Sequence, residues 1–226
     1  MRDPLFIFML TRNDATVANA AELAHEAIAA GARHIGFKDT GAPPAVLKSL
    51  TEQLKAAGVT TYLEVVSLGA AVELASAELA LALGVDVLMG GVRPEVVGRR
   101  VEGAGVRYFP FAGRVVDHPS VLAGPPDEIV ASARDIAALP GVDGLDLLAY
   151  RSAHDGGVLA RAVCAAVAKP VVVAGSIDRP DRIAAVRQAG AHAFTVGTAA
   201  LDGAFPAAAP GLAGQLAAIQ AAIAGA

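Results

Sequence analysis

One lysine of this chain stands where an amine could take part in chemistry. Lys38 directly follows the predicted strand His34–Phe37, whereas two of the other three lysines fall within a predicted helix and Lys169 precedes a strand. Side chains alternate along a strand, so Lys38 points to the side opposite Phe37. If Phe37 faces the covering helices, Lys38 points inward. There it can form a Schiff base with a carbonyl compound, or stay charged and stabilise an enolate or a carboxylate. A structural ion pair is the alternative.

Two carboxylates interrupt strands that are otherwise apolar. Glu64 lies within the predicted strand 61–66, and Asp146 lies within the predicted strand 142–148. A carboxylate buried in such a strand destabilises the fold unless it is paired, so we expect Glu64 to meet Lys38 or Arg12. Carboxylates that face one cation can act as base and acid in proton transfer. Lys38, Glu64 and Asp146 are the predicted catalytic residues, with a paired core charge as the alternative for Glu64.

Two glycine turns near the end of the chain could hold an anion. The strand 171–173 runs into a turn at Gly175, and the strand 192–196 runs into a turn at Gly197 with a short helix start after Thr198. Glycines let main-chain N–H groups approach an anion closely, and a helix start adds its positive end. The alternative is that these glycines only make tight turns between strand and helix. Other strand-end residues, Arg12, Asp39 and Arg151, are predicted to bind substrate.

The elements that must position these residues follow a regular pattern of helix, glycine and strand. Glycine suits the left-handed position just past a helix end, so a glycine at this point of a unit marks the end of a helix before a strand. These glycines are Gly31, Gly58, Gly84, Gly105, Gly141 and Gly190. Eight such units predict a single (βα)8 TIM barrel over residues 1–226, whose functional face lies at the carboxyl ends of the strands. An open doubly wound sheet is the alternative, but the first turn, 10–15, has no glycine of the dinucleotide-binding type. The predicted strands are Leu5–Leu10, His34–Phe37, Thr61–Val66, Val85–Met89, Arg107–Phe111, Val142–Leu148, Val171–Val173 and His192–Val196, and the predicted helices are Val17–Ala30, Pro44–Ala57, Gly69–Leu83, Arg93–Val101, Asp127–Ala138, Gly157–Ala168, Arg179–Ala189 and Gly211–Ala224.

Over Lys169 to Leu201 the chain resembles the phosphate-binding half of the ribulose-phosphate-binding barrels, and elsewhere the likeness is architectural. That superfamily includes isomerases of histidine and tryptophan biosynthesis, indole-glycerol-phosphate synthase, N-acylmannosamine-6-phosphate epimerase and the hexulose-phosphate synthases. The resemblance implies a phosphorylated sugar or similar ligand held by the main chain at four positions. These are Gly175, Ser176, Gly197 and Thr198.

This chain does not contain the complete set of catalytic residues of any of these relatives. The decarboxylase members carry Asp-x-Lys-x-x-Asp on the third strand, where this chain has Leu63 to Ser67, and related aldolases place a lysine where it has Asp146. Asp14 and Asp117 lie only near the paired aspartates of the isomerases. We expect an isomerase or epimerase that moves a proton on a phosphorylated sugar or small phosphorylated carbonyl compound. A carbon–carbon lyase (aldolase or decarboxylase) and a non-catalytic phosphometabolite-binding barrel are the alternatives.

Composition excludes several partners. The chain of 226 residues has a net charge of −4 and no basic run, which argues against nucleic acid. The most apolar stretch, Gly69 to Met89, contains three acidic residues, which argues against a membrane span. The start of the chain enters a strand without a cleavable apolar segment, so we expect a cytoplasmic protein. Cys164 is predicted to fill the core. The alanine-rich helices suggest a homo-oligomer.

No cofactor is expected. Closely spaced histidine or cysteine pairs are absent from the sequence, although a loosely held Mg²⁺ on Asp39, Glu64 or Asp146 is an open alternative. Flavin mononucleotide would suit the same glycine turns. It is disfavoured because the chain has seven phenylalanines, three tyrosines and no tryptophan.

Overall fold

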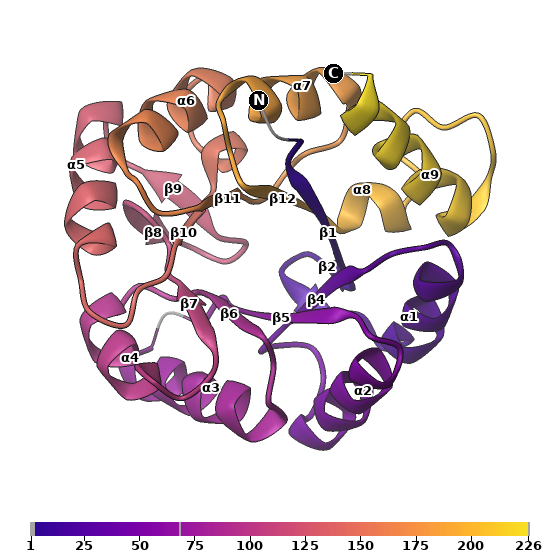
Figure 1. Cartoon of the computed structure of the whole chain (residues 1–226), viewed down its shortest axis with the longest axis horizontal. Helices are drawn as coiled ribbons and strands as arrows, with labels where there is room; N and C mark the ends of the chain where they lie inside the picture. The colour runs from indigo at the N-terminus through magenta and orange to yellow at the C-terminus, as the bar shows by residue number, and fades with distance from the viewer. Residues whose placement is uncertain (1–2, 68, 226) are drawn as a thin grey trace.

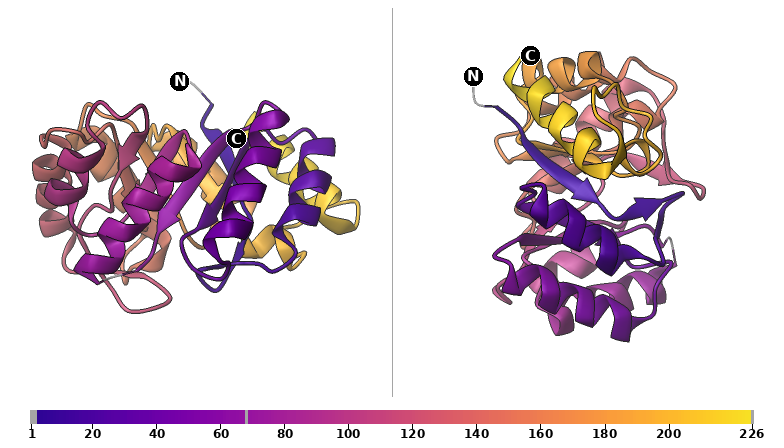
Figure 2. Two further views of the ribbon diagram at one scale, coloured as in Figure 1. Left: turned by 90° about the horizontal axis from the view of Figure 1, so that it is seen from below. Right: turned by 90° about the vertical axis from the view of Figure 1, so that its right-hand side faces the viewer.

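Eight parallel strands form a ring, and the helices pack around its outside (Figure 1). The structure is a computed structural model that describes residues 3–67 and 69–225. Figure 2 shows the same ring and its covering helices from two further sides. The predicted (βα)8 barrel is confirmed. The barrel strands are β1 (Leu5–Met9), β4 (His34–Lys38), β5 (Thr60–Val65), β6 (Val87–Gly90), β7 (Arg107–Phe109), β10 (Leu145–Leu147), β11 (Val171–Val173) and β12 (Ala193–Val196).

The ring closes between β7 and β10. Seven neighbouring pairs, in the order β10-β11-β12-β1-β4-β5-β6-β7, are joined by parallel ladders. The eighth junction is a parallel bridge between Phe111 and Asp146. There the N–H of Asp146 donates to the carbonyl of Pro110 at 2.8 Å, and the N–H of Ala112 donates to the carbonyl of Asp146 at 2.9 Å. Because these bonds join the first and last strands of the series, the open sheet is excluded.

Side-chain alternation separates an outer core from an inner one. On β1, Phe6 and Phe8 pack with the helix-facing residues, whereas Ile7 and Met9 point into the barrel. Strands that are covered on both faces need apolar residues on both, which is why these segments are unbroken apolar runs. The inner core is small and lies inside the ring of strands. Its members are Ile7, Met9, Tyr62, Val87, Met89, Phe109, Val172 and Ala193.

Each helix stop predicted from a glycine is followed by that glycine in the left-handed conformation, directly after the helix at Gly84 and four residues after it at Gly105 and Gly141. Gly31, Gly58, Gly84, Gly105, Gly141 and Gly190 all adopt positive φ, between 66° and 93°. The helix α6 ends at Ala166, two residues before the predicted Ala168, because the chain turns extended at Val167 on its way to Pro170. The helices are α1 (Ala20–Ala29), α2 (Pro44–Ala56), α3 (Ala70–Leu83), α4 (Pro94–Val101), α5 (Pro126–Ala137), α6 (Gly156–Ala166), α7 (Pro180–Gln188), α8 (Thr198–Leu201) and α9 (Gly211–Ala224), with a 3₁₀ turn η1 (Ala149–Arg151).

Two hairpins that the sequence pattern does not predict lie beyond the carboxyl ends of β1 and β7. One joins β2 (Thr11–Arg12) to β3 (Ala15–Thr16), and the other joins β8 (Arg114–Val116) to β9 (Val121–Ala123). Their strands have only two or three residues, too few to show a period. In the first hairpin the two turn residues, 13 and 14, have φ values of 48° and 57°. Positive φ at both central positions is what a two-residue type I′ turn requires.

None of the helices in the described part of the chain combines the length and apolar character needed to cross a membrane.

Candidate active site

A cavity of about 840 Å³ opens at the carboxyl ends of the barrel strands. It receives side chains from β1, β4, β5 and β12, from the β8–β9 hairpin, and from the segments that follow β10, β11 and β12. The same space therefore contains the predicted lysine–carboxylate pair and both predicted glycine turns. Among the residues that line it are Lys38, Glu64, Ser120, Arg151, Gly175, Ser176, Gly197 and Thr198.

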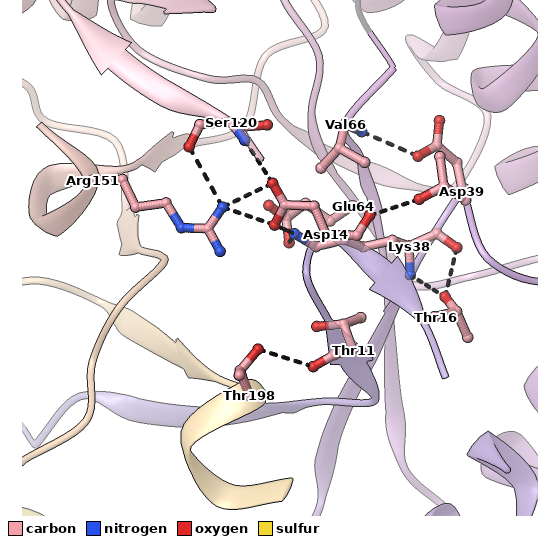
Figure 3. Close-up of polar contacts among 11 residues, drawn as sticks. Thr11, Asp14, Thr16, Lys38, Asp39, Glu64, Val66, Ser120, Arg151 and Thr198 are labelled. Carbon is pink, nitrogen blue, oxygen red and sulfur yellow. Dashed lines mark hydrogen bonds and ion pairs between the residues drawn. The ribbon is translucent and has the colours of Figure 1, made fainter. Parts of the chain in front are cut away.

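Lys38 points into the barrel and is 4% exposed. Phe37 packs against the helices, which is the condition on which the inward prediction depended. The Nζ atom lies 2.6 Å from Oδ1 of Asp14 and 3.4 Å from Oε2 of Glu64 (Figure 3). Glu64 thus pairs with Lys38, one of its two predicted partners. The ammonium is held between two carboxylates and still borders the cavity.

Asp14 joins three separate parts of the chain. Its buried carboxylate accepts bonds from Lys38 Nζ at 2.6 Å, from Arg151 Nη1 at 2.7 and 2.8 Å, and from the main-chain N–H of Ser120 at 2.7 Å. Burial by itself raises the pKa of Asp14, but the charges and hydrogen bonds of Lys38, Arg151 and Ser120 outweigh burial and hold the pKa well below its usual value. Asp14 is therefore an anion that neutralises part of the charge of both cations.

The predicted site does not include Asp14 or Ser120. The available signal is the Asn13-Asp14 dipeptide, since these two residue types tolerate the left-handed turn conformation better than other non-glycine residues. That signal predicts the turn but not the bonds. Arg151 is 137 residues away from Asp14 in the sequence, and Ser120 is 106 residues away.

Asp146 points into the barrel from β10 and is fully buried. Within the described residues, neither carboxyl oxygen has a hydrogen-bond partner. Burial raises the pKa of Asp146 well above its usual value, and the Glu64 carboxylate raises it further, while Lys38 and Arg151 offset only part of this. These surroundings favour the protonated form of the carboxyl, and Asp146 does not border the cavity itself.

The two glycine turns lie against neighbours that leave no room for a larger residue. Gly175 has φ +79°, and a Cβ there would lie 2.6 Å from Nε of Arg151. A Cβ at Gly197 would lie 2.9 Å from the carbonyl of Met9. Within the described residues no protein acceptor is assigned to the N–H groups of Gly175, Ser176 or Gly197. These three donors at the cavity wall could bind an anionic oxygen.

Two of the residues predicted to bind substrate lie elsewhere. Asp39 accepts from the main-chain N–H of Val66 at 3.1 Å and from the Ser76 hydroxyl at 2.7 Å, so it joins β5 to α3. The alternation that points Lys38 inward points Asp39 outward. Arg12 is bound to the exposed Asp202 and does not border the cavity. Asp202 itself lines the cavity, so Arg12 lies one residue behind the lining, Asp39 faces away from the cavity, and Arg151 lines it.

Residues 3–67 and 69–225 contain no group of three or more His, Cys, Asp or Glu side chains arranged to hold a metal ion. Asp39 faces the helices while Glu64 faces the barrel interior, so these two carboxylates do not share one site.

The sequence matches no family model and no curated protein. Solved structures are similar in fold. N-(5'-phosphoribosyl)anthranilate isomerase from Pyrococcus furiosus has a TM-score of 0.66 at 10% identity, with 99% of this chain and 100% of that chain covered. N-acetylmannosamine-6-phosphate 2-epimerase from Clostridium perfringens has a TM-score of 0.65 at 13% identity, with 86% of each chain covered.

FabK from Thermotoga maritima has a TM-score of 0.60 at 16% identity over 87% of this chain. The present chain spans only 58% of the length of that protein. At such identities the likeness establishes the fold: the chain has the (βα)8 barrel that these proteins share.

Proposed function

We propose that the protein is an enzyme that isomerises or epimerises a phosphorylated sugar or a small phosphorylated carbonyl compound by proton transfer. One observation carries the proposal. The cavity at the carboxyl ends of the strands has main-chain N–H groups at Gly175, Ser176 and Gly197, without an acceptor among the described residues, on one side and the Lys38–Glu64 pair on another. An anchor for an anion and a set of proton-transfer groups thus share one space.

The phosphate would bind to the N–H groups of the two glycine turns, together with Thr198 and the free edge of Arg151. Arg151 uses Nη1 for Asp14, and the described residues offer no partner to its Nε and Nη2 atoms. A planar guanidinium suits a phosphate because it can donate two bonds at once. The anchored phosphate would leave the carbonyl end of the substrate near Lys38 and Glu64.

Three groups would then divide the chemistry. Lys38 would stabilise the negative charge that develops on the carbonyl oxygen as a neighbouring carbon loses its proton. Glu64 would take up that proton and return it to the neighbouring carbon of the enediolate, and the buried Asp146, which does not line the cavity, would act through its charge interaction with Glu64 and not on the substrate itself.

The comparisons support this class of reaction without fixing the substrate. The names of two similar proteins identify an isomerase and a 2-epimerase, and both names include a phosphorylated sugar group.

A panel of phosphorylated aldoses and ketoses in D₂O tests the proposal. The expected result is that the enzyme incorporates deuterium beside the carbonyl of at least one of them, and that the matching sugar without phosphate exchanges at least about 100-fold more slowly because its anchor is lost. Glu64→Gln should abolish the exchange. Phosphate binding without exchange of any panel member would favour the non-catalytic alternative.

A carbon–carbon lyase is the second candidate, because the Lys38 amine borders the cavity and could add to a carbonyl carbon. Borohydride separates the two reactions. Reduction in the presence of a phosphorylated keto substrate should leave the protein mass unchanged under the main proposal. A covalent adduct on Lys38 would establish the lyase chemistry instead.

A further inference from the structure

The β2–β3 hairpin is attached to the end of β4 by bonds from several of its residues. The Thr16 hydroxyl donates to the Lys38 carbonyl at 2.9 Å and accepts from the Lys38 N–H at 2.8 Å. The N–H of Thr16 donates to the carbonyl of Thr40 at 2.9 Å, and the Thr40 hydroxyl donates to the carbonyl of Asp14 at 2.7 Å. The hairpin therefore fixes the main chain of Lys38 and places the Asp14 carboxylate within hydrogen-bond distance of the Lys38 ammonium.

Close packing keeps this attachment in one position. Gly41 has φ +87°, and a Cβ there would lie 2.4 Å from the carbonyl oxygen of Thr16. Only glycine allows β3 to approach the segment after β4 this closely. Thr16 is buried, and the Asp14 side chain has no exposed surface.

Asp14 is the link between the two cations of the cavity. Its Oδ1 atom lies 2.6 Å from Nζ of Lys38 and 2.7 Å from Nη1 of Arg151 (Figure 3). On its other side Arg151 lies across the Gly175 turn, because a Cβ at Gly175 would lie 2.6 Å from Nε and 2.8 Å from Cδ of Arg151. Contacts therefore run without a gap from the glycine turn through Arg151 and Asp14 to Lys38.

We propose that Asp14 is a positioning residue that couples occupancy of the anion site to Lys38. The inference rests on the proposed function, since it takes the anion site to lie at the Gly175 and Gly197 turns. A phosphate bound there draws on the charge of Arg151 and weakens the bond between Arg151 and Asp14. The carboxylate then binds Lys38 more strongly, so the ammonium is held most firmly when the phosphate of a substrate is in place. Such coupling requires that Asp14 be shared between the two cations.

The four lysines of the chain make the coupling measurable. In protein labelled with ¹⁵N at lysine Nζ, the ammonium protons of Lys38 should exchange slowly with water and give a resolved signal, because Lys38 is 4% exposed and paired with two carboxylates. The signal is assigned by its loss in Lys38→Met. Inorganic phosphate is the probe, and its binding is measured independently by calorimetry.

In the wild-type protein the Lys38 signal should shift during the titration and follow the same saturation curve as the calorimetric binding. In Asp14→Asn, phosphate should still bind through the main-chain donors and Arg151, but the Lys38 signal should no longer respond. Asp178→Asn is the matched control, because Asp178 also lines the cavity and has no bond to Lys38. That variant should keep the response.

Arg151→Lys gives a second test should Asp14→Asn fail to fold, because Arg151 lies at the partly exposed rim. The lysine side chain of this variant is shorter and has a single ammonium group, which cannot contact both the glycine turn and Asp14. The response of the Lys38 signal to phosphate should therefore be lost. Phosphate binding with an unmoved Lys38 signal in the wild-type protein, or an equal shift in Asp14→Asn, would overturn the coupling and leave the proposed function intact. No phosphate binding to the wild-type protein would overturn both.

Discussion

The two ends of the barrel use carboxylates in opposite ways. At the amino ends of the strands, Asp86 accepts from the N–H of Thr61 at 2.7 Å and from its hydroxyl at 2.8 Å, and Asp143 accepts from the N–H of Tyr108 at 2.9 Å. At the carboxyl ends, Asp14 is shared between cations from distant segments, and Asp146 has no hydrogen-bond partner in the described residues.

The difference separates groups that stabilise the sheet from groups available for chemistry. A carboxylate bound to main-chain N–H groups of the neighbouring strand fixes the register of the sheet, and its oxygens are already used. A buried carboxyl without a partner destabilises the fold, and natural proteins accept such groups mainly where function needs them. This contrast supports the proposed placement of the site at the carboxyl ends of the strands, independently of the glycine turns.

The largest expected effect is on catalysis at the carboxyl end. Lys38→Met should lower the rate of deuterium exchange by about 100- to 1000-fold, the usual cost of removing one donor to a developing oxyanion. Lys55→Met is the control, because Lys55 is 43% exposed and pairs with Asp86 at the other end. Exchange rates with the active phosphosugar check both variants, and equal rates for Lys38→Met and Lys55→Met would contradict the division between the ends.

Opposite changes in stability are expected for carboxyls at the two ends. Asp146→Val removes a buried carboxyl without a partner from a strand, so the free energy of unfolding should rise by about 1–3 kcal/mol. Asp143→Ala leaves the N–H of Tyr108 without its acceptor, so that free energy should fall by about 1 kcal/mol. Urea denaturation measures both. A large loss of stability in Asp146→Val would mean that Asp146 supports the fold.

The pH dependence of stability should also differ in sign. The folded-state pKa of Asp146 is raised above 3.8, chiefly by burial, so the native state keeps a proton that the unfolded chain releases. The free energy of unfolding should therefore fall as pH rises from 3.8 towards that pKa, by at most about 1.4 kcal/mol per pH unit.

The pKa of Asp86 moves the other way. Burial raises it, but the bonds from Thr61 outweigh burial and lower it below 3.8. Its contribution to stability is present above pH 3.8 and is lost as pH falls through the lowered pKa. Urea unfolding at a series of pH values should show the first contribution removed in Asp146→Asn and the second removed in Asp86→Asn, while the contributions of Glu73 and Asp14 remain. A pH dependence that is the same in Asp146→Asn as in the wild-type protein would count against a raised pKa of Asp146.

The smallest expected effect is a difference in phosphate affinity between alanine variants of two glycines with positive φ. Gly175 and Gly190 have φ values of +79° and +76°, but only a Cβ at Gly175 meets a neighbour, Arg151. The backbone strain should cost both alanine variants a similar amount of stability, and Gly175→Ala should lose somewhat more because its Cβ displaces Arg151. Only Gly175→Ala should also weaken phosphate binding, roughly tenfold or about 1.4 kcal/mol. Calorimetry with inorganic phosphate makes the comparison, and equal affinities in the two variants would argue against an anion at Gly175.

Much of the fold and part of the site follow from the sequence. The sequence predicts the barrel because a glycine after each helix and the apolar strand that follows it can both be recognised within a short stretch of the chain. Alternation correctly places Lys38 inward, and applied one residue further it also places Asp39 outward.

The central position of Asp14 could not be predicted. It depends on a hairpin whose strands have two residues each, and on partners from segments that only the closed ring brings together. Asp146 was accessible to prediction as a charge in an apolar strand, but its lack of partners is a property of packing.

A crystal structure of the protein grown in phosphate tests the central claim most directly. The account predicts an anion bound to the N–H groups of Gly175, Ser176 and Gly197, contacted by the free edge of Arg151, in the cavity that also contains Lys38. Phosphate bound at another face, or none at a saturating concentration, would contradict it.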